Sequence, residues 1–100
     1  MEYKENVLCY EDYCELRESV GWLLFSKEQT QKALTNSLYT VIAVKDSQTV
    51  GMGRLIGDGM YYMIADIVVQ PNCQKHGIGS RIINMLTEYV DKETPIGGRS

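Results

Sequence analysis

In the N-terminal third of the chain, two capping signals each precede a segment that we expect to be helical. Asp12 and Glu15 stand three residues apart, a spacing in which the two residues satisfy free N–H groups at the start of a helix. Gly21 predicts the end of that first helix, because glycine readily adopts the left-handed conformation that terminates helices. Ser26 and Gln29 repeat the capping signal, so a second helix is expected after them, continuing to Ser37.

Strand-like segments fill the start and the middle of the chain. A short strand is expected over residues 5–9. The β-branched run 39–44 predicts a second strand, and residues 49–56 predict its antiparallel partner after a tight turn. The strongly apolar segment 60–70 predicts a long strand, which ends at Pro71 because proline has no N–H to donate to a sheet.

A third helix is predicted to begin near Gly77 or Gly79, because apolar residues then recur on one helical face. That face consists of Ile82, Ile83, Leu86, Tyr89 and Val90. The order of elements predicts an α/β fold with a mixed, mainly antiparallel sheet of about four strands and helices packed on its faces. A chain of 100 residues suffices for one domain, which we expect to span residues 1–100.

Composition and charge narrow the class of protein. Ten basic and 13 acidic residues give a net charge of −3, which argues against a nucleic-acid partner because phosphate binding needs a basic surface. The apolar run 22–25 is far too short for a membrane span, and the N-terminus lacks a signal-peptide pattern. Cys9, Cys14, Cys73 and the single His76 form neither a disulfide framework nor a metal-binding motif. We therefore expect a cytoplasmic chain that uses no metal and does not bind membranes.

The segment with the clearest chemistry is residues 67–81, IVVQPNCQKHGIGSR, in which a buried strand leads through a short loop into a helix. The two glycines allow the backbone to approach a ligand closely. The first turn of a helix has unpaired N–H groups and the positive end of the helix dipole, which together favour phosphate. Lys75, His76 and Arg81 add cationic or hydrogen-bonding side chains, so this segment predicts a site for one anionic ligand.

Within this segment, residues 74–79 (QKHGIG) match the Q/R-x-x-G-x-G/A signature of the GNAT superfamily of acetyl-CoA-dependent N-acetyltransferases. The chain also resembles this family in the apolar strand before the signature, the helix after it, and the two helices and hairpin upstream, over residues 9–92. The resemblance implies a GNAT-like fold and the transfer of an acetyl group from acetyl-CoA to a primary amine of a small molecule or peptide. No residue chooses between these two acceptors.

The resemblance also implies where the coenzyme lies. Main-chain groups at the end of the long strand would hold the pantetheine arm, and N–H groups of the loop and helix start would hold the pyrophosphate. The residues implied in coenzyme binding are Ile67, Val68, Val69, Gln74, Lys75, His76, Gly77, Ile78, Gly79, Ser80 and Arg81. No residue is assigned as the catalytic acid or base.

The sequence departs from the family after Lys92. GNAT domains continue into a fifth strand, a further helix and closing strands, and a tyrosine in that part often protonates the leaving thiolate; these patterns do not follow Lys92 here. We therefore expect part of a GNAT domain, with the C-terminal strands missing. A second hypothesis is a non-catalytic module that binds CoA or self-associates, as a homodimer formed along the unpaired edge of the long strand.

Five further side chains have both a functional and a structural interpretation. Asp66, inside an apolar strand, is either a general base or a structural carboxylate bonded to backbone. Arg54 either meets an acidic substrate or lies on a solvated strand face, the default for an arginine. Tyr13 and Trp22 lie where GNAT proteins often line the acceptor pocket, with ordinary packing as the alternative. Cys73 is expected to be a small packing residue rather than a reactive thiol.

Overall fold

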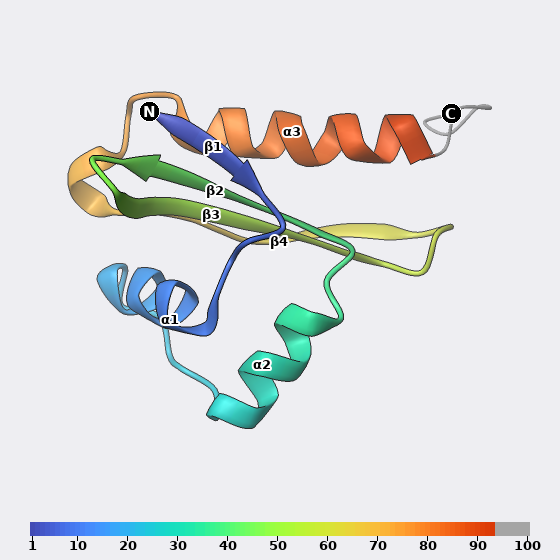
Figure 1. Cartoon of the computed structure of the whole chain (residues 1–100), viewed down its shortest axis with the longest axis horizontal. Helices are drawn as coiled ribbons and strands as arrows, with labels where there is room; N and C mark the ends of the chain where they lie inside the picture. Colours follow the sequence, from blue (N-terminus) through green and yellow to red (C-terminus); the bar gives the residue numbers. More distant parts are fainter. Residues whose placement is uncertain (94–100) are drawn as a thin grey trace.

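Four antiparallel strands and three α-helices make up residues 1–93, which are the part of the chain that the computed structural model describes. In chain order the elements are β1 (Glu2–Glu5), α1 (Tyr10–Ser19), α2 (Lys27–Thr35), β2 (Tyr39–Lys45), β3 (Gln48–Gly57), β4 (Tyr62–Val69), the 3₁₀ turn η1 (Pro71–Cys73) and α3 (Ile78–Glu93). The strands form one sheet in the order β1-β2-β3-β4. Helices α1 and α2 cover one face of this sheet and α3 covers the other (Figure 1). The expected α/β class and sheet are confirmed.

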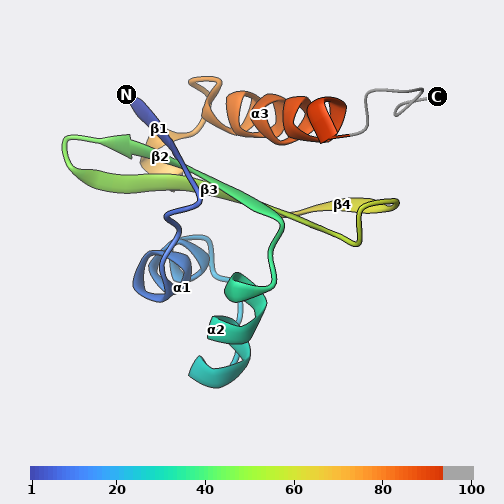
Figure 2. The ribbon, with the colours of Figure 1, turned by 45° about the vertical axis from the view of Figure 1, so that its right-hand side comes forward.

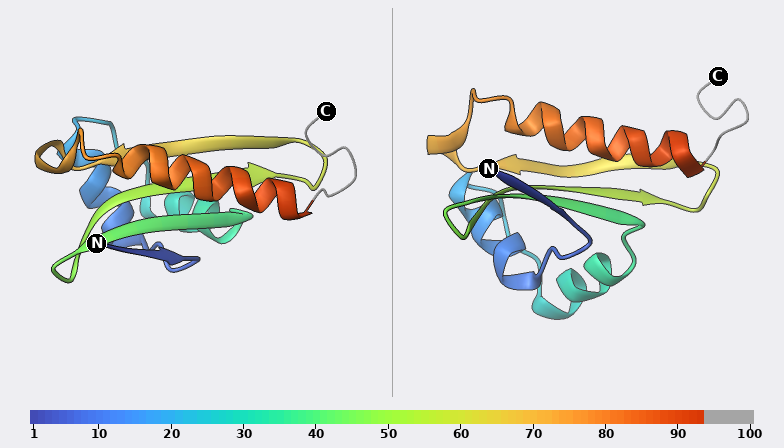
Figure 3. Two further views of the ribbon diagram at one scale, coloured as in Figure 1. Left: turned by 90° about the horizontal axis from the view of Figure 1, so that it is seen from above. Right: turned by 45° about the horizontal axis from the view of Figure 1, so that its top comes forward.

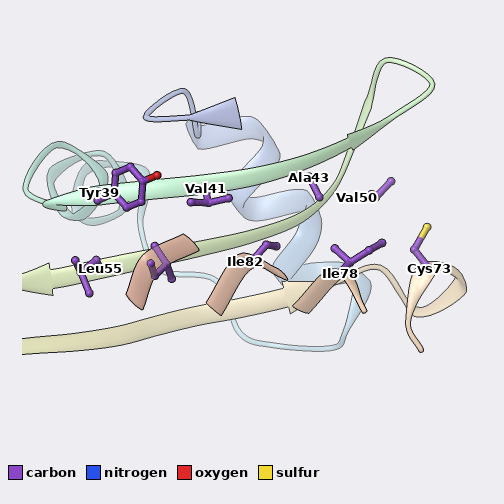
Figure 4. Packing of buried hydrophobic residues seen from close by; sticks show 9 residues of the cluster. Tyr39, Val41, Ala43, Val50, Leu55, Cys73, Ile78 and Ile82 are labelled. Carbon is purple, nitrogen blue, oxygen red and sulfur yellow. The ribbon is translucent and has the colours of Figure 1, made fainter. Parts of the chain in front are cut away.

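The sheet separates two apolar layers, because its central strands are buried on both faces. Alternate residues of β2 belong to different layers: Val41 and Ala43 pack with α3, whereas Ile42 and Val44 pack with α1. The α3 layer comprises Tyr39, Val41, Ala43, Val50, Leu55, Cys73, Ile78, Ile82 and Leu86 (Figure 4). The α1 layer comprises Tyr13, Cys14, Leu16, Ile42, Val44, Met52 and Val68.

Helix α3 lies lengthwise over the sheet and close to it (Figures 2 and 3). The close approach occurs at Gly53 of β3: a Cβ atom there would lie 2.6 Å from Cγ2 of Ile82 and 2.7 Å from Cδ1 of Ile67. Gly51 is similarly enclosed, with Cγ2 of Ile78 3.1 Å from the corresponding position. Glycine in the middle of this strand is therefore a packing requirement of the helix above it.

The prediction for the first strand and the first cap was wrong. The strand is Glu2–Glu5 rather than 5–9, and it pairs with β2 from Glu2 opposite Val44 to Glu5 opposite Val41. Helix α1 begins at Tyr10, so Asp12 lies inside its first turn and does not cap it. The Asp12 carboxylate instead accepts a hydrogen bond of 2.7 Å from the hydroxyl of Thr49, a partner 37 residues away.

The other element predictions were close to the structure, except that Ile83, expected on the core-facing side of the third helix, is 39% exposed. Ser26 caps α2, its hydroxyl oxygen accepting a bond of 3.1 Å from the N–H of Gln29. The hairpin of β2 and β3 is present, and Gly21 follows α1 with a φ of +77°. The long strand is β4, somewhat shorter than residues 60–70. No helix within residues 1–93 has the length and apolar character to cross a bilayer.

Candidate functional site

A hollow forms where β4 gives way to α3. Its volume is about 260 Å³, and we refer to it as the loop hollow. It is lined by Val69, Cys73, Gln74, Lys75, Gly77, Ile78, Gly79 and Ser80. The sequence-predicted site therefore converges in space: seven of the eleven predicted coenzyme-binding residues, namely Val69, Gln74, Lys75, Gly77, Ile78, Gly79 and Ser80, line one concavity.

The backbone around the loop hollow is shaped by two left-handed residues. Lys75 has a φ of +69° and Gly77 a φ of +77°. Nothing lies within 4 Å of a Cβ placed on Gly77, so the glycine faces open space and leaves its backbone accessible. The Gln74 amide donates a bond of 3.0 Å to the carbonyl of Val69, which ties the loop to the end of β4. These features hold the loop as a short concave turn.

The start of α3 directs backbone donors toward the loop hollow. Its first helical hydrogen bond runs from the N–H of Arg81 to the carbonyl of Gly77, at 3.0 Å. The N–H groups of the residues just before Arg81 have no partner within a helix and point out of its N-terminal end. Because the helix dipole is positive at this end, the arrangement suits an anionic oxygen-rich ligand such as a pyrophosphate.

Of the three predicted cationic or hydrogen-bonding side chains, Lys75 lines the loop hollow, whereas His76 and Arg81 are not among its lining residues. Lys75, His76 and Arg81 are exposed, and none of them forms an ion pair within residues 1–93. The Arg81 guanidinium lies 5.6 Å from the centre of the Tyr3 ring, which holds its stem against the sheet. The charge of Lys75 is thus available to a ligand of the loop hollow in a chain whose net charge is −3.

The predicted strand residues of the site lie on opposite faces of β4. Ile67 packs against the α3 layer, and Val68 is buried in the α1 layer with 3% exposure. Since both side chains pack in the core, only the main-chain groups of these residues could contact a ligand.

Strand β4 contains a bulge at Asp66. Met52 pairs with Val68 but Arg54 pairs with Ala65, so that Gly53 stands opposite two residues of β4. Asp66 adopts a φ of +55°, a left-handed conformation that is unusual outside glycine and more accessible to aspartate than to most side chains. A bulge re-aims the side chains beside it. Here it turns the Asp66 carboxylate toward α1.

The Asp66 carboxylate is the centre of a buried polar cluster. One oxygen accepts bonds from the Tyr13 hydroxyl at 2.7 Å and from Nε of Arg54 at 2.8 Å, and the other accepts from Nη1 of Arg17 at 2.9 Å. The side chains of Asp66 and of both arginines are each 11% exposed. Each oxygen therefore already has a cationic donor, which favours the structural interpretation of Asp66, with side-chain rather than backbone partners.

The expectation of a solvated Arg54 was wrong. Arg54 is 9% exposed, and besides Asp66 its Nη1 bonds the carbonyl of Ala33 at 3.2 Å and the hydroxyl of Ser37 at 3.0 Å. Arg17 was missed altogether by sequence reasoning. The available signal was Asp66 itself, because a carboxylate in an apolar strand requires buried partners, but the sequence does not say which arginines supply them.

Aromatic rings enclose the Arg17 guanidinium. Its central carbon lies 5.7 Å from the Tyr13 ring centre, 5.1 Å from that of Trp22 and 5.2 Å from that of Phe25. Its Nε and Nη2 also donate to the carbonyl of Leu23, at 2.9 and 2.7 Å. The segment between α1 and α2 is thereby fixed to the polar cluster. Burial of Tyr13, and then its hydrogen bond to the Asp66 carboxylate, raise the pKa of its phenol.

A second and larger concavity adjoins this cluster, on the face of the sheet that α1 and α2 cover. Its volume is about 470 Å³, and we refer to it as the α1–α2 cavity. It is lined by Tyr13, Phe25, Gln29, Thr30, Lys32, Ala33 and Arg54. Of the two aromatic candidates, Tyr13 lines the cavity, whereas Trp22 stacks on Arg17 beside it. Within residues 1–93, no group of three His, Cys, Asp or Glu side chains is arranged to hold a metal ion.

Comparison with known proteins agrees with this geometry. The family model of the acetyltransferase (GNAT) domain matches residues 11–96. The N-acetyltransferase ycf52 of Pyropia yezoensis, itself described as uncharacterized, is 33% identical over 91 residues, which cover 86% of this chain and 52% of that protein. The chain therefore belongs to the GNAT acetyltransferase family, and it spans about half the length of that curated relative.

Solved structures show the same fold. A probable acetyltransferase from meticillin-resistant Staphylococcus aureus is 34% identical, with a TM-score of 0.84 over 91% of this chain and 69% of that one. A GNAT-family protein from Streptococcus pneumoniae is 31% identical, with a TM-score of 0.77 over 87% of this chain and 65% of that one. An aminoglycoside 6′-N-acetyltransferase complexed with coenzyme A has a TM-score of 0.76 over 93% of this chain and 57% of that one; at 20% identity it is evidence for the fold alone.

Proposed function

We propose that this chain binds acetyl-CoA at the loop hollow and contributes to acetyl transfer from that thioester to a primary amine. The observation that carries the proposal is the convergence of Gly77, the N-terminal end of α3 and the unpaired Lys75 on one concavity. Membership of the GNAT family supports the same ligand. The residues that would hold the coenzyme are those predicted from the sequence, from Ile67 to Val69 and from Gln74 to Arg81.

Different residues of this chain would bind different parts of the coenzyme. Backbone N–H groups between Gln74 and Gly79 would hold the pyrophosphate, with Lys75, His76 and Arg81 adding charge. Main-chain groups of β4 next to the bulge would hold the pantetheine arm in the manner of an added strand. In the transfer, the amine nitrogen bonds to the thioester carbonyl carbon while the carbon–sulfur bond breaks, which yields an N-acetyl product and the free thiol.

Positioning is the main catalytic contribution that this architecture offers. Strand β4, which would hold the coenzyme, is bonded through Asp66 to Tyr13 and Arg54 of the α1–α2 cavity lining, so the two reactants would lie close together. Such proximity alone supplies a large part of an enzymatic rate. The acceptor is proposed to be an amine of a small molecule or of a peptide. It must lose its proton before it attacks, since a free alkyl amine is largely protonated at neutral pH.

Titration calorimetry with acetyl-CoA tests the proposal, using wild type, Gly77→Glu and the control Gly59→Glu. Both glycines have positive φ, +77° and +99°, and both face open space, so the two substitutions impose similar backbone strain and the same added charge. Only Gly77 lies in the loop hollow. We expect binding by wild type and by Gly59→Glu, and its loss in Gly77→Glu.

Two outcomes would contradict the proposal. The coenzyme role would be excluded if the wild-type chain folds but does not bind acetyl-CoA, and if a chain extended beyond residue 100 does not bind it either. Equal loss of binding in both glycine variants would show that binding does not depend on the loop hollow.

A self-associating module is the second candidate, because β4 is the outer strand of the sheet within residues 1–93. Beside its unpaired edge Met60, Tyr61, Met63 and Ile64 are 79%, 77%, 60% and 40% exposed. An edge of this kind readily pairs with another chain. Sedimentation equilibrium distinguishes the candidates: a homodimer that Ile64→Lys dissociates supports the module, and a monomer at all concentrations excludes it.

A further inference from the structure

The α1–α2 cavity is positively charged in a chain that is negative overall. Among its seven lining residues are Lys32 and Arg54, and no Asp or Glu of residues 1–93 lines it. The whole chain, by contrast, carries a net charge of −3. The positive sign is thus a local property of this concavity.

The buried polar cluster of Asp66, Arg17 and Arg54 also carries a net positive charge. Arg17 and Arg54 share the single carboxylate of Asp66, so two guanidinium charges are offset by one negative charge. Guanidinium groups remain protonated at all ordinary pH values. One net positive charge is therefore left beneath the cavity, in surroundings where water screens it less than at the surface.

Both lining cations have capacity for a further partner. Nη2 of Arg54 donates no hydrogen bond within residues 1–93, while its Nε and Nη1 are engaged. Lys32, on the exposed side of α2, forms no ion pair within the same residues. A planar guanidinium edge and an ammonium group on one concavity form a suitable pair of donors for a carboxylate.

The remaining walls are apolar or neutral. Tyr13 and Phe25 present aromatic rings, and Gln29 and Thr30 present hydrogen-bonding groups without charge. The volume of about 470 Å³ corresponds to a small molecule. Within residues 1–93, no carboxylate among these walls offsets Lys32 and Arg54, so a polycationic acceptor would be repelled by both side chains.

We infer that the acceptor bound in the α1–α2 cavity is a small amine that also carries a carboxylate, which Arg54 and Lys32 recognise. This inference rests on the proposed acetyl transfer and names its substrate class. The acceptor would thus resemble an amino acid in charge, with one anionic group held at the cavity and the amine left free to react. It differs from the polycationic class that the aminoglycoside-modifying structural neighbours are named for.

The test measures binding of matched ligands to the 100-residue chain by chemical-shift titration. The probes are L-phenylalanine and L-leucine, the carboxamide of each, and spermidine as a polycation. We expect each acid to bind about tenfold more tightly than its amide, the difference that a charge-assisted hydrogen bond supplies, and spermidine to bind more weakly than either acid.

Two lysine variants locate the effect on α2. Lys32→Gln removes a cavity-lining charge, whereas Lys27→Gln removes a charge from the same helix that lies over the Tyr10 ring, 5.4 Å from its centre, and outside the cavity lining. We expect Lys32→Gln to weaken binding of the acids several-fold and to leave the amides unchanged. Lys27→Gln is expected to change neither.

Several results would overturn the inference. These are amides or spermidine that bind as tightly as the acids, a Lys32→Gln variant that affects acids and amides alike, or no binding of any probe in the cavity. Acetyl-CoA calorimetry on the same sample separates this failure from failure of the proposed function: acetyl-CoA that binds while the acids show no advantage overturns only the substrate class.

Discussion

Asp66 is the residue on which the interior charge balance of the molecule depends. Its single negative charge is shared by Arg17 and Arg54, at 2.9 and 2.8 Å, and all three side chains are 11% exposed. Removing one partner of a buried ion pair leaves the other charge without compensation, which costs far more than loss of a surface pair.

We expect Asp66→Asn to lower the free energy of unfolding by about 3 kcal/mol. Asparagine tolerates the left-handed backbone at this position, so the change removes charge with little added strain. Asp46→Asn is the control, because Asp46 also has a positive φ, +51°, but is exposed in the β2–β3 turn. Urea denaturation of both variants checks the prediction, and equal stabilities would contradict it.

Gly53 is the second residue whose replacement has a definite expected cost. A methyl group there would collide with Ile82 and Ile67 at 2.6 and 2.7 Å, so α3 would have to move away from the sheet. We expect Gly53→Ala to destabilise the fold by about 1–3 kcal/mol. Gly79→Ala serves as the comparison, since its nearest contact would be an ordinary 3.8 Å to Val69. A thermal unfolding midpoint of Gly53→Ala at or above that of wild type would show that the interface adapts.

At the scale of elements, α2 is the helix whose start is determined locally. The hydroxyl of Ser26 accepts the N–H of Gln29, and its carbonyl accepts both the N–H and the hydroxyl of Thr30. We expect Ser26→Ala to cost about 1 kcal/mol in unfolding free energy, the usual value of an N-cap. The substitution Gln31→Ala, at an exposed position of the same helix, is expected to leave stability nearly unchanged. Guanidinium denaturation of the two variants distinguishes them.

The two N-terminal helices show what sequence patterns can and cannot locate. Ser26 and Gln29 identify a cap because both partners lie in the same turn. Asp12 and Glu15 form the same pattern, yet Asp12 bonds Thr49 on β3, and this distant partner takes the place of the cap. Local hydrogen-bond signals hold only where the tertiary fold offers no competing partner.

The same distinction applies to the candidate site. The residues that line the loop hollow all come from the short segment 69–80, so its composition was readable as a motif. The Asp66 cluster joins residues that lie 12, 49 and 53 positions apart, and the bulge that assembles it has no sequence signal of its own. Asp66 was recognised as anomalous, while Arg17 and the burial of Arg54 followed only from the fold.

At the scale of the whole molecule, each apolar layer contains one tyrosine bonded to a carboxylate. Tyr13 in the α1 layer donates to Asp66, and Tyr39 in the α3 layer donates to Glu5 and stacks on Tyr89 at 4.4 Å. Burial, followed by the carboxylate hydrogen bond, raises the pKa of both phenols. Folding therefore favours the protonated form of each.

We expect stability to be fully retained below the unfolded tyrosine pKa of about 10 and to fall as pH rises above it. The sign follows from the raised folded-state pKa values: above pH 10 the unfolded chain releases protons that the folded chain keeps. Urea titrations between pH 8 and 11 measure the slope. Tyr39→Phe should reduce that slope, whereas Tyr61→Phe, with a ring that is 77% exposed, is the control. A pH-independent stability in this range would contradict the prediction.

The two concavities are formed by different parts of the chain. The loop hollow adjoins the start of α3, whereas the α1–α2 cavity lies beneath the opposite face. The two concavities share no lining residue. An engineer who exchanges residues 10–35 for another segment must nevertheless retain Tyr13 and Arg17, because both bind Asp66 of β4, the strand whose end borders the loop hollow.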